Sequence, residues 1–241
     1  MLGEVFAKVS MGDSRMQLGR MGAMLQRRYR HVWLILAALL LLPATAFGSA
    51  PGPILVRGDS LSAEHNLPAG SGWVSLLEKR LRSELAQPPA VVNASISGET
   101  SAGALSRLPA LLSRHRPSVL VIELGGNDAL RGLPPAQLSS NLERMVVLGK
   151  QAGARILLLG IDVPPNYGPA YRARLRQTYQ DLAGEHGASL VPFFLEGVAL
   201  QPGLMQSDSL HPNAAAQPRL LDNVWPALKP LIPGASRSGG R

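Results

Sequence analysis

The 241-residue sequence contains no cysteine, and aromatic residues make up only 5% of it. Without cysteine the chain has no disulfide, no thiolate nucleophile and no cysteine-ligated zinc. Nucleic-acid binding usually requires a clustered basic face, yet the chain has no run of three or more consecutive Lys and Arg. These absences argue against a nucleic-acid-binding or thiol-based protein. The 46% of hydrophobic residues is typical of a soluble globular protein.

The first 50 residues differ from the rest in charge and pattern. They hold six Lys and Arg against two acidic residues, and so carry four of the eight net positive charges. A basic patch at 27–31, the apolar run Val32–Leu42 and small residues at 43–50 together form the pattern of a secretory signal peptide. The run of about 11 residues is too short for a membrane-spanning helix. We predict cleavage after Ala46 or after Ala50, and a start at Met24 would give the leader an ordinary length.

Residues 51–233 are predicted to form a single domain, because a chain of this length supports one full hydrophobic core. With the predicted flexible tail, residues 234–241, they carry the other four net positive charges. Such a mild excess allows only a weak contact with anionic membrane surfaces. We expect a monomer that is periplasmic or secreted once the leader is removed.

Strand-like runs alternate with segments of helical period beyond residue 50. We predict strands at 54–57, 90–94, 119–124, 155–161 and 189–192, and helices at 73–81, 105–112, 138–152, 170–186 and 214–228. The second of these helices is expected to break near Pro109, because proline removes a helical hydrogen bond. The alternation indicates an α/β fold, with a parallel sheet covered by helices on both faces. Ligands of such sheets bind beyond the carboxyl ends of the strands.

A serine follows the first predicted strand in the sequence Gly58-Asp59-Ser60-Leu61-Ser62. Alone, this pattern also fits a serine that caps a helix after a turn. Far downstream, Asp208 and His211 supply a carboxylate and an imidazole three residues apart. A serine hydroxyl becomes a good nucleophile when a base takes its proton, and a carboxylate can hold that base in the right tautomer. The three residues predict a catalytic triad with Ser60 as the nucleophile.

Two further loops offer hydrogen-bond donors near this serine. Gly98 follows the second predicted strand, and Asn127 follows the third. The backbone N–H groups of Ser60 and Gly98 and the side-chain amide of Asn127 are predicted to form an oxyanion hole. Each of the two loop residues alone also fits an ordinary turn. Their shared place at one edge of the predicted sheet favours the catalytic interpretation.

The blocks around these residues resemble the SGNH, or GDSL-type, hydrolase superfamily. Its name lists a serine, a glycine, an asparagine and a histidine, which match Ser60, Gly98, Asn127 and His211. The stretches 92–101, 123–132 and 210–218 are most similar to the bacterial periplasmic group of thioesterase I, lysophospholipase L1 and arylesterase. The resemblance extends over about residues 53–231.

This resemblance implies a three-layer α/β/α, flavodoxin-like fold with a five-stranded parallel sheet. It also implies cleavage of acyl esters and thioesters without a cofactor, with Asp208 as the third triad residue. The segment 129–134 is similar to a loop that closes over the acyl chain in the thioesterase group. We therefore expect the substrate to contact Leu130, Leu133, Asn166, Tyr167 and Leu210. The other histidines lack paired ligand spacing, so we predict no metal site and read them as surface or leader residues.

Two positions depart from what this group usually carries. Arg57 stands where relatives usually have an apolar residue, and a charge at the end of a central strand needs a partner or water. We expect its guanidinium to reach the rim, to contact an anionic head group or to pair with Glu64; a direct catalytic role is less favoured. Asp162 lies where an arginine is common in this group. The contribution of that arginine to substrate preference is therefore not expected in this protein.

The sequence thus predicts a secreted serine esterase that forms an acyl-enzyme on Ser60. Its expected substrates are lysophospholipids, fatty-acyl thioesters and short or aryl esters. A carbohydrate O-acetylesterase acting on envelope glycans is the alternative among enzymes, because the same triad can remove acetyl groups. A non-catalytic module that binds lipid or glycan is less favoured, since a pure binder has no need of a base beside a serine.

Overall fold

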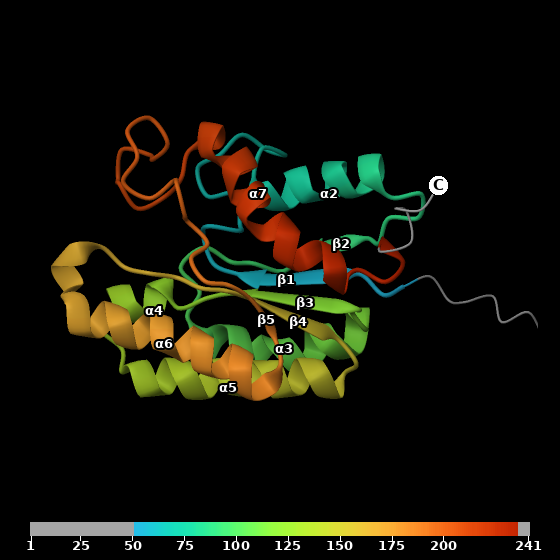
Figure 1. The fold of residues 1–241 in the computed structure, drawn as a ribbon, viewed down its shortest axis with the longest axis horizontal. Coiled ribbons are helices and arrows are strands. Elements are labelled where there is room, and N and C mark those ends of the chain that lie inside the picture. Colours follow the sequence, from blue (N-terminus) through green and yellow to red (C-terminus); the bar gives the residue numbers. More distant parts are fainter. Residues whose placement is uncertain (1–50, 236–241) are drawn as a thin grey trace, which may run out of the picture. The chain divides into compact units, whose positions relative to one another are not determined.

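A computed structural model of the protein describes residues 51–235 (Figure 1). In this part of the chain one parallel sheet lies between two layers of helices. The predicted leader, its cleavage sites and residues 236–241 of the predicted tail lie outside the described residues. No helix within 51–235 is long and apolar enough to span a bilayer.

The sheet contains five parallel strands in the order β2-β1-β3-β4-β5, which confirms the predicted fold class. The strands are β1 (Ile54–Gly58), β2 (Val91–Asn93), β3 (Val119–Glu123), β4 (Arg155–Leu159) and β5 (Ser189–Val191). Every residue of β1 and β3 is buried, because helices cover both faces, and their sequences therefore read as nearly continuous apolar runs. The chain changes direction across the sheet between β1 and β3, where folds of this strand order bind their ligands.

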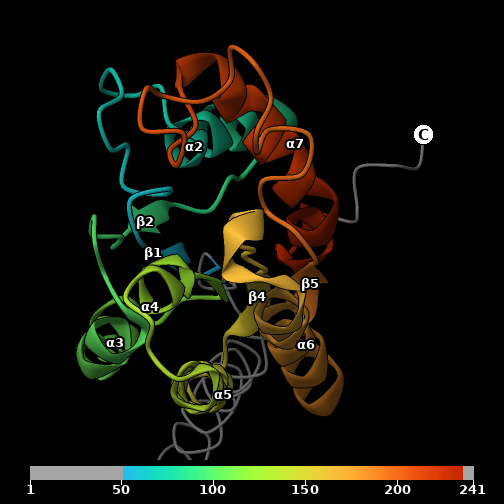
Figure 2. The ribbon, with the colours of Figure 1, turned by 90° about the vertical axis from the view of Figure 1, so that its left-hand side faces the viewer.

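Helices of two layers cover the sheet, as Figures 1 and 2 show. On one face lie α2 (Trp73–Glu84) and α7 (Gln217–Leu228), and on the other lie α3 (Ser101–His115), α5 (Pro135–Gln151) and α6 (Pro169–His186). Helix α2 buries Trp73, Val74, Leu77 and Leu81, the spacing of one apolar helical face. Helix α3 begins where the Thr100 side chain accepts the N–H of Gly103, an ordinary N-terminal cap.

The predicted break at Pro109 is wrong, because α3 continues through this residue. Proline removes only its own hydrogen bond, while the helix buries Ala104, Leu105, Leu108 and Leu112 on both sides of it. Tertiary packing of this face supplies most of the stability of such a helix. The sequence also did not predict α4 (Gly126–Leu130) or the short 3₁₀ turns Pro165–Tyr167 and Lys229–Leu231. The predicted helix 214–228 begins with a 3₁₀ turn, Ala214–Ala216, and continues as α7.

Candidate active site

Ser60 lies in the turn that follows β1, at the point where the chain changes direction across the sheet. The turn begins at Gly58, where a Cβ atom would lie 2.7 Å from both Glu123 Oε2 and Ser62 Oγ. Only glycine fits such a close approach. The apolar strand and this glycine therefore place Ser60 at the carboxyl edge of the sheet, where it is half-buried.

The structure brings the three predicted triad residues together. His211 Nε2 lies 2.8 Å from Ser60 Oγ, and His211 Nδ1 lies 2.6 Å from Asp208 Oδ2. An ionised carboxylate only accepts hydrogen bonds, so the network assigns the ring proton to Nδ1. Nε2 then accepts the hydroxyl proton of Ser60, which is the arrangement that a general base requires.

Asp208 belongs to a tight turn that its own side chain stabilises. Its Oδ1 atom accepts the backbone N–H groups of Leu210 at 2.9 Å and His211 at 3.0 Å. Partial burial raises the pKa of Asp208, but the hydrogen bonds from the backbone and ring of His211 and from Leu210 outweigh it and lower the pKa to about 2. The carboxylate therefore stays charged at neutral pH and holds the imidazole in one orientation.

The three predicted oxyanion donors come from three loops. Within residues 51–235, the backbone N–H groups of Ser60 and Gly98 donate to no acceptor. Asn127 Nδ2 donates to Asp59 Oδ2 at 2.9 Å, which leaves its second N–H. Gly98 has a φ of 78°, and its carbonyl accepts Arg131 Nη2 at 2.9 Å. Each of the three loops thus keeps one polar N–H without an acceptor in the described part of the chain.

Asp59 is a carboxyl group of the site that the sequence reasoning did not single out, although it belongs to the Gly-Asp-Ser-Leu motif. It is 2% exposed and also accepts the N–H of Leu61 at 3.0 Å. Burial raises the pKa of Asp59 to about 6, while the hydrogen bonds from Leu61 and Asn127 oppose this rise. Its neighbour Glu123 is fully buried, and desolvation together with the charge of Asp59 raises the pKa of Glu123 well above its usual range.

We predict that Asp59→Asn makes the free energy of unfolding less dependent on pH. A pKa that folding raises from 3.8 to about 6 means that the folded state loses stability as pH rises through this interval. The loss amounts to about 2 kcal/mol between pH 4 and pH 8. Urea unfolding at pH 4 and at pH 8 measures this loss of stability. In Asp59→Asn the difference between pH 8 and pH 4 should shrink by this amount, whereas the exposed control Asp222→Asn should keep it. An unchanged difference in Asp59→Asn would contradict the prediction.

A cavity of about 280 Å³ opens beside Ser60 and His211. Its walls are mainly apolar and include Leu130, Ile161, Val163, Phe193, Leu195 and Leu210. The predicted contacts Leu130 and Leu210 therefore line it, and they are 44% and 40% exposed. Phe193 and Leu195 were missed, although they follow the last predicted strand and so lie at the functional edge.

Three other predicted substrate contacts do not line this cavity. Leu133 is half-buried in the loop before α5, and Asn166 is exposed in the 3₁₀ turn before α6. Tyr167 packs its ring near that of Tyr171, with 6.2 Å between the ring centroids. These three residues are close in sequence to residues that line the cavity. The directions of their side chains depend on tertiary packing, which the sequence pattern does not show.

Asp162 lies in the wall of the cavity and binds two arginines. Its carboxylate accepts Nε and Nη2 of Arg172 at 3.0 and 2.6 Å, and Nη1 of Arg176 at 2.7 Å. Burial raises the pKa of Asp162, but the hydrogen bonds from Arg172, Val163 and Arg176 outweigh it and lower this pKa. The cluster brings two positive charges and one negative charge to this side of the cavity.

The predicted pairing of Arg57 with Glu64 is wrong. Arg57 is fully buried and contacts the carbonyl of Ala94 and the carboxylate of Glu99. Glu64 accepts instead the backbone N–H groups of residues 70 and 72 and the hydroxyl of residue 75. These three donors satisfy the carboxylate of Glu64 locally. The guanidinium of Arg57 points into the protein and does not reach the rim of the sheet.

His65, predicted as a surface residue, packs against the imidazole of His211. The two ring centroids lie 4.6 Å apart, and the rings are tilted by 44°. His65 Nδ1 also lies 3.4 Å from Ser97 Oγ, so this ring joins the loop before Gly98 to the triad. Within residues 51–235 no group of three or more His, Asp or Glu side chains is arranged to hold a metal ion.

Comparison with known proteins places these residues in a family. Esterase TesA of Pseudomonas aeruginosa is 53% identical over 199 residues, covering 83% of this chain and 98% of that protein. Thioesterase 1/protease 1/lysophospholipase L1 of Escherichia coli K12 is 43% identical over 194 residues, covering 80% and 91%. The crystal structure of TesA superposes with a TM-score of 0.73 at 56% identity, covering 75% of this chain and 99% of that one. A sequence model of the GDSL-like lipase/acylhydrolase family matches residues 56–218, and the chain belongs to this family.

Proposed function

We propose that the protein is a serine esterase that cleaves acyl esters and thioesters through an acyl-enzyme on Ser60. The observation that carries the proposal is the 2.8 Å contact between His211 Nε2 and Ser60 Oγ beside an apolar cavity. A non-catalytic binding module has no need of this contact. The esterase and thioesterase names of the relatives agree with the proposed chemistry.

In the acylation half of the proposed reaction, Ser60 Oγ attacks the acyl carbonyl carbon while His211 Nε2 takes its proton. Asp208 stabilises the imidazolium that results. The carbonyl oxygen becomes an oxyanion, which the N–H groups of Ser60, Gly98 and Asn127 bind as its charge develops. The carbon–oxygen or carbon–sulfur bond then breaks. The alcohol or thiol leaves with the proton that His211 returns, and the acyl group stays on Ser60.

In the deacylation half, a water molecule takes the place of the leaving group. His211 removes a proton from the water as it attacks the acyl carbon, so the same oxyanion forms and the same donors bind it. The bond to Ser60 Oγ breaks as His211 returns the proton to the serine. The products are a free carboxylic acid and the unchanged enzyme, and no redox partner takes part.

We infer that the acyl chain of a small-molecule or lipid ester occupies the apolar cavity. Hydrocarbon gains about 0.8 kcal/mol for each CH₂ group removed from water, so this cavity favours acyl chains over acetylated sugars. The test is a comparison of kcat/KM for p-nitrophenyl octanoate with that for an acetylated xylan or chitin oligosaccharide. Preference for the sugar would support the carbohydrate O-acetylesterase instead.

An organophosphonate that carries a reporter tests the nucleophile itself. We expect stoichiometric labelling, loss of esterase activity in step with labelling, and an adduct on Ser60 located by peptide mass spectrometry. Heat-denatured protein provides the control, because the reaction requires the assembled triad. An adduct on another serine, or full activity after labelling, would overturn the proposal.

Leu130→Ala tests the proposed acyl site. Leu130 lines the cavity and is 44% exposed, so a bound chain can cover it. Loss of about 1 kcal/mol of apolar contact corresponds to an increase of about fivefold in KM for p-nitrophenyl octanoate, while KM for the acetate should stay within twofold. Leu133→Ala is the matched control, because Leu133 lies three residues after Leu130, in the loop that follows α4, and is outside the cavity lining. Equal effects of both variants would contradict the proposed site.

We also propose that the mature enzyme acts in the periplasm or outside the cell. The support is the basic patch, the short apolar run and the small residues that precede residue 51. Expression in a Gram-negative host followed by cell fractionation and intact mass measurement tests this location. We expect a periplasmic protein that begins within a few residues of position 50, and an uncleaved cytoplasmic chain would overturn it.

A further inference from the structure

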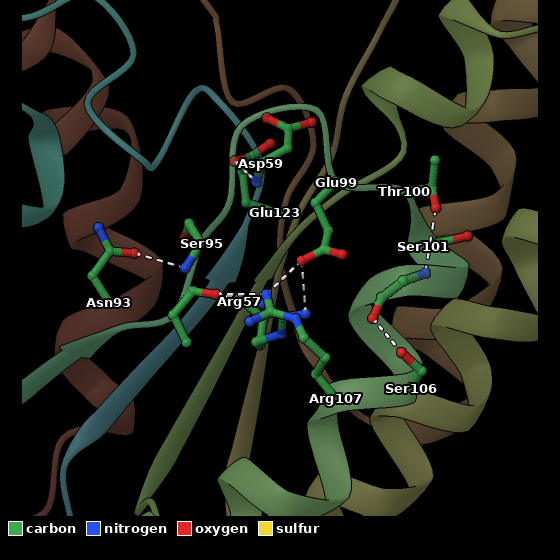
Figure 3. A network of polar contacts seen from close by, with 12 residues as sticks. Arg57, Asp59, Asn93, Ser95, Glu99, Thr100, Ser101, Ser106, Arg107 and Glu123 are labelled. Carbon is green, nitrogen blue, oxygen red and sulfur yellow. Dashed lines mark hydrogen bonds and ion pairs between the residues drawn. The ribbon is translucent and has the colours of Figure 1, made fainter.

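Three charged side chains form a cluster behind the loop that carries Gly98. Arg57 and Arg107 both place a guanidinium against the carboxylate of Glu99, as Figure 3 shows. The side chain of Arg57 is 0% exposed and that of Glu99 is 10% exposed, whereas Arg107 is 38% exposed. The pair of Arg57 and Glu99 is thus held inside the protein, and Arg107 closes it from the outside.

Arg57 contacts both ends of the Gly98 loop. It lies in β1, three residues before Ser60, and its Nη1 donates to the carbonyl of Ala94, where the loop begins. Its Nη2 donates to Glu99 Oε2 at 3.3 Å, directly after Gly98. The planar guanidinium of Arg57, which lies on the nucleophile's strand, therefore holds the entry and the exit of the loop that supplies an oxyanion donor. Arg107 donates to the same two acceptors from α3, on the more exposed side.

Stability alone does not account for this cluster. Two arginines share one carboxylate, and Nε of both Arg57 and Arg107 has no hydrogen-bond partner among the described residues. Burial and the positive charge of Arg107 lower the pKa of Arg57, as expected for a cation in an unfavourable position. Replacing a buried ion pair with apolar residues is often neutral or stabilising. A geometric role explains better why the charge is kept there.

We propose that Arg57 is a positioning residue that fixes the N–H of Gly98 relative to Ser60 Oγ. The inference rests on the proposed function, in which both groups act on one carbonyl. An oxyanion donor works at 2.7–3.1 Å from the developing charge, and misplacement by about 1 Å can cost about 10²-fold in rate. Ser60 follows β1 and Gly98 follows β2, and Arg57, which lies in β1, links these two segments directly.

The test compares Arg57→Met with Arg155→Met, using p-nitrophenyl butyrate. Methionine keeps the unbranched stem of arginine up to the position of Nε but lacks the donors of the guanidinium, so it binds neither loop end. We expect Arg57→Met to lower kcat by about 10-fold to 100-fold with KM within twofold, because the donor acts on the transition state. Arg155 lies at the start of β4, at the other end of the strands from Ser60, and its guanidinium contacts the carbonyls of Pro230 and Leu231 in the 3₁₀ turn after α7. Arg155→Met should keep the wild-type kcat, and a wild-type kcat in Arg57→Met would overturn the inference.

A double-mutant cycle with Gly98→Ala separates positioning from a general loss of structure. Alanine is strained at a φ of 78°, so Gly98→Ala already displaces this donor. If Arg57 acts through Gly98, adding Arg57→Met to Gly98→Ala should lower kcat by less than threefold further. Fully additive losses in kcat would overturn the inference, because they would mean that Arg57 acts elsewhere.

Arg57→Lys keeps the buried charge and guards against a variant that fails to fold. A single ammonium group replaces the fork of the guanidinium, so it cannot hold both loop ends, and we expect kcat to fall at least threefold with KM unchanged. A wild-type kcat would overturn the inference. Absence of Ser60-dependent hydrolysis in the unmodified enzyme would overturn the proposed function as well, whereas an active enzyme that is insensitive to Arg57 would overturn the inference alone.

Discussion

Ser60→Ala should lower kcat for p-nitrophenyl butyrate by about 10⁶-fold. Loss of a triad nucleophile has this effect because the remaining groups cannot form the covalent intermediate. The activity that remains should come from oxyanion stabilisation and substrate binding, which the alanine variant keeps. KM, or Kd for a non-hydrolysable ester analogue, should change little, since Ser60 Oγ contributes one polar contact beside a mainly apolar cavity.

Stopped-flow and long-term steady-state assays together cover this range of rates. Ser106→Ala is the matched control, because the hydroxyl of Ser106 only donates to the carbonyl of Gly103 within the exposed face of α3. This control should keep the wild-type kcat. A rate in Ser60→Ala within tenfold of the wild type would reject Ser60 as the nucleophile and would leave the contact with His211 unexplained.

The order of strands and helices was predictable because each element carries a clear pattern. The apolar runs of β1 and β3 are buried on both faces, and helices such as α2 bury one regular stripe. Helix α4 escaped prediction because its five residues are too few for a helical period. The error at Pro109 has a different cause, since local propensity indicated a break but the packing of α3 against the sheet outweighed it.

The edge of the sheet that carries the candidate site was predictable because a general rule of α/β sheets converts chain position into spatial proximity. Residues that follow β1, β2 and β3 meet at one edge, so Ser60, Gly98 and Asn127 were expected there without coordinates. The partners of Arg57 and the approach of His65 to His211 were not predictable in this way. The first depends on how the loop after β2 packs against β1, and the second on how two loops pack against each other. No spacing along the chain encodes either contact.

Two carboxyl groups near the serine have pKa values shifted in opposite directions. Asp208 is 38% exposed and receives hydrogen bonds from two backbone N–H groups and a ring, so its pKa is lowered. Asp59 is 2% exposed, and desolvation raises its pKa to about 6. Such a division lets one carboxylate remain charged beside the base at every pH of interest. Loss of activity on mild acidification therefore cannot be assigned to protonation of Asp208.

Asp208→Asn should lower kcat by about 10⁴-fold at pH 7. Asp208 Oδ1 accepts two backbone N–H groups, and in the variant only the amide oxygen can take that place. The NH₂ group must then lie where Oδ2 faces His211 Nδ1, and it can only donate there. Nδ1 therefore becomes the acceptor, the ring proton moves to Nε2, and the base that should take the proton of Ser60 is occupied.

This reversed tautomer has a signature besides the rate. In ¹⁵N-labelled wild-type enzyme, Nδ1 of His211 should carry the proton and Nε2 should not, and in Asp208→Asn the two ring nitrogens should exchange roles in the NMR spectrum. Asp222→Asn is the control for the chemical change alone, because Asp222 is exposed on α7 and pairs with Arg80 of α2. A slow Asp208→Asn enzyme that keeps the wild-type tautomer would mean that Asp208 acts mainly through its charge, by stabilising the imidazolium. A fast one would mean that the turn from Asp208 to His211, held by its backbone bonds, orients the imidazole without help from the carboxylate.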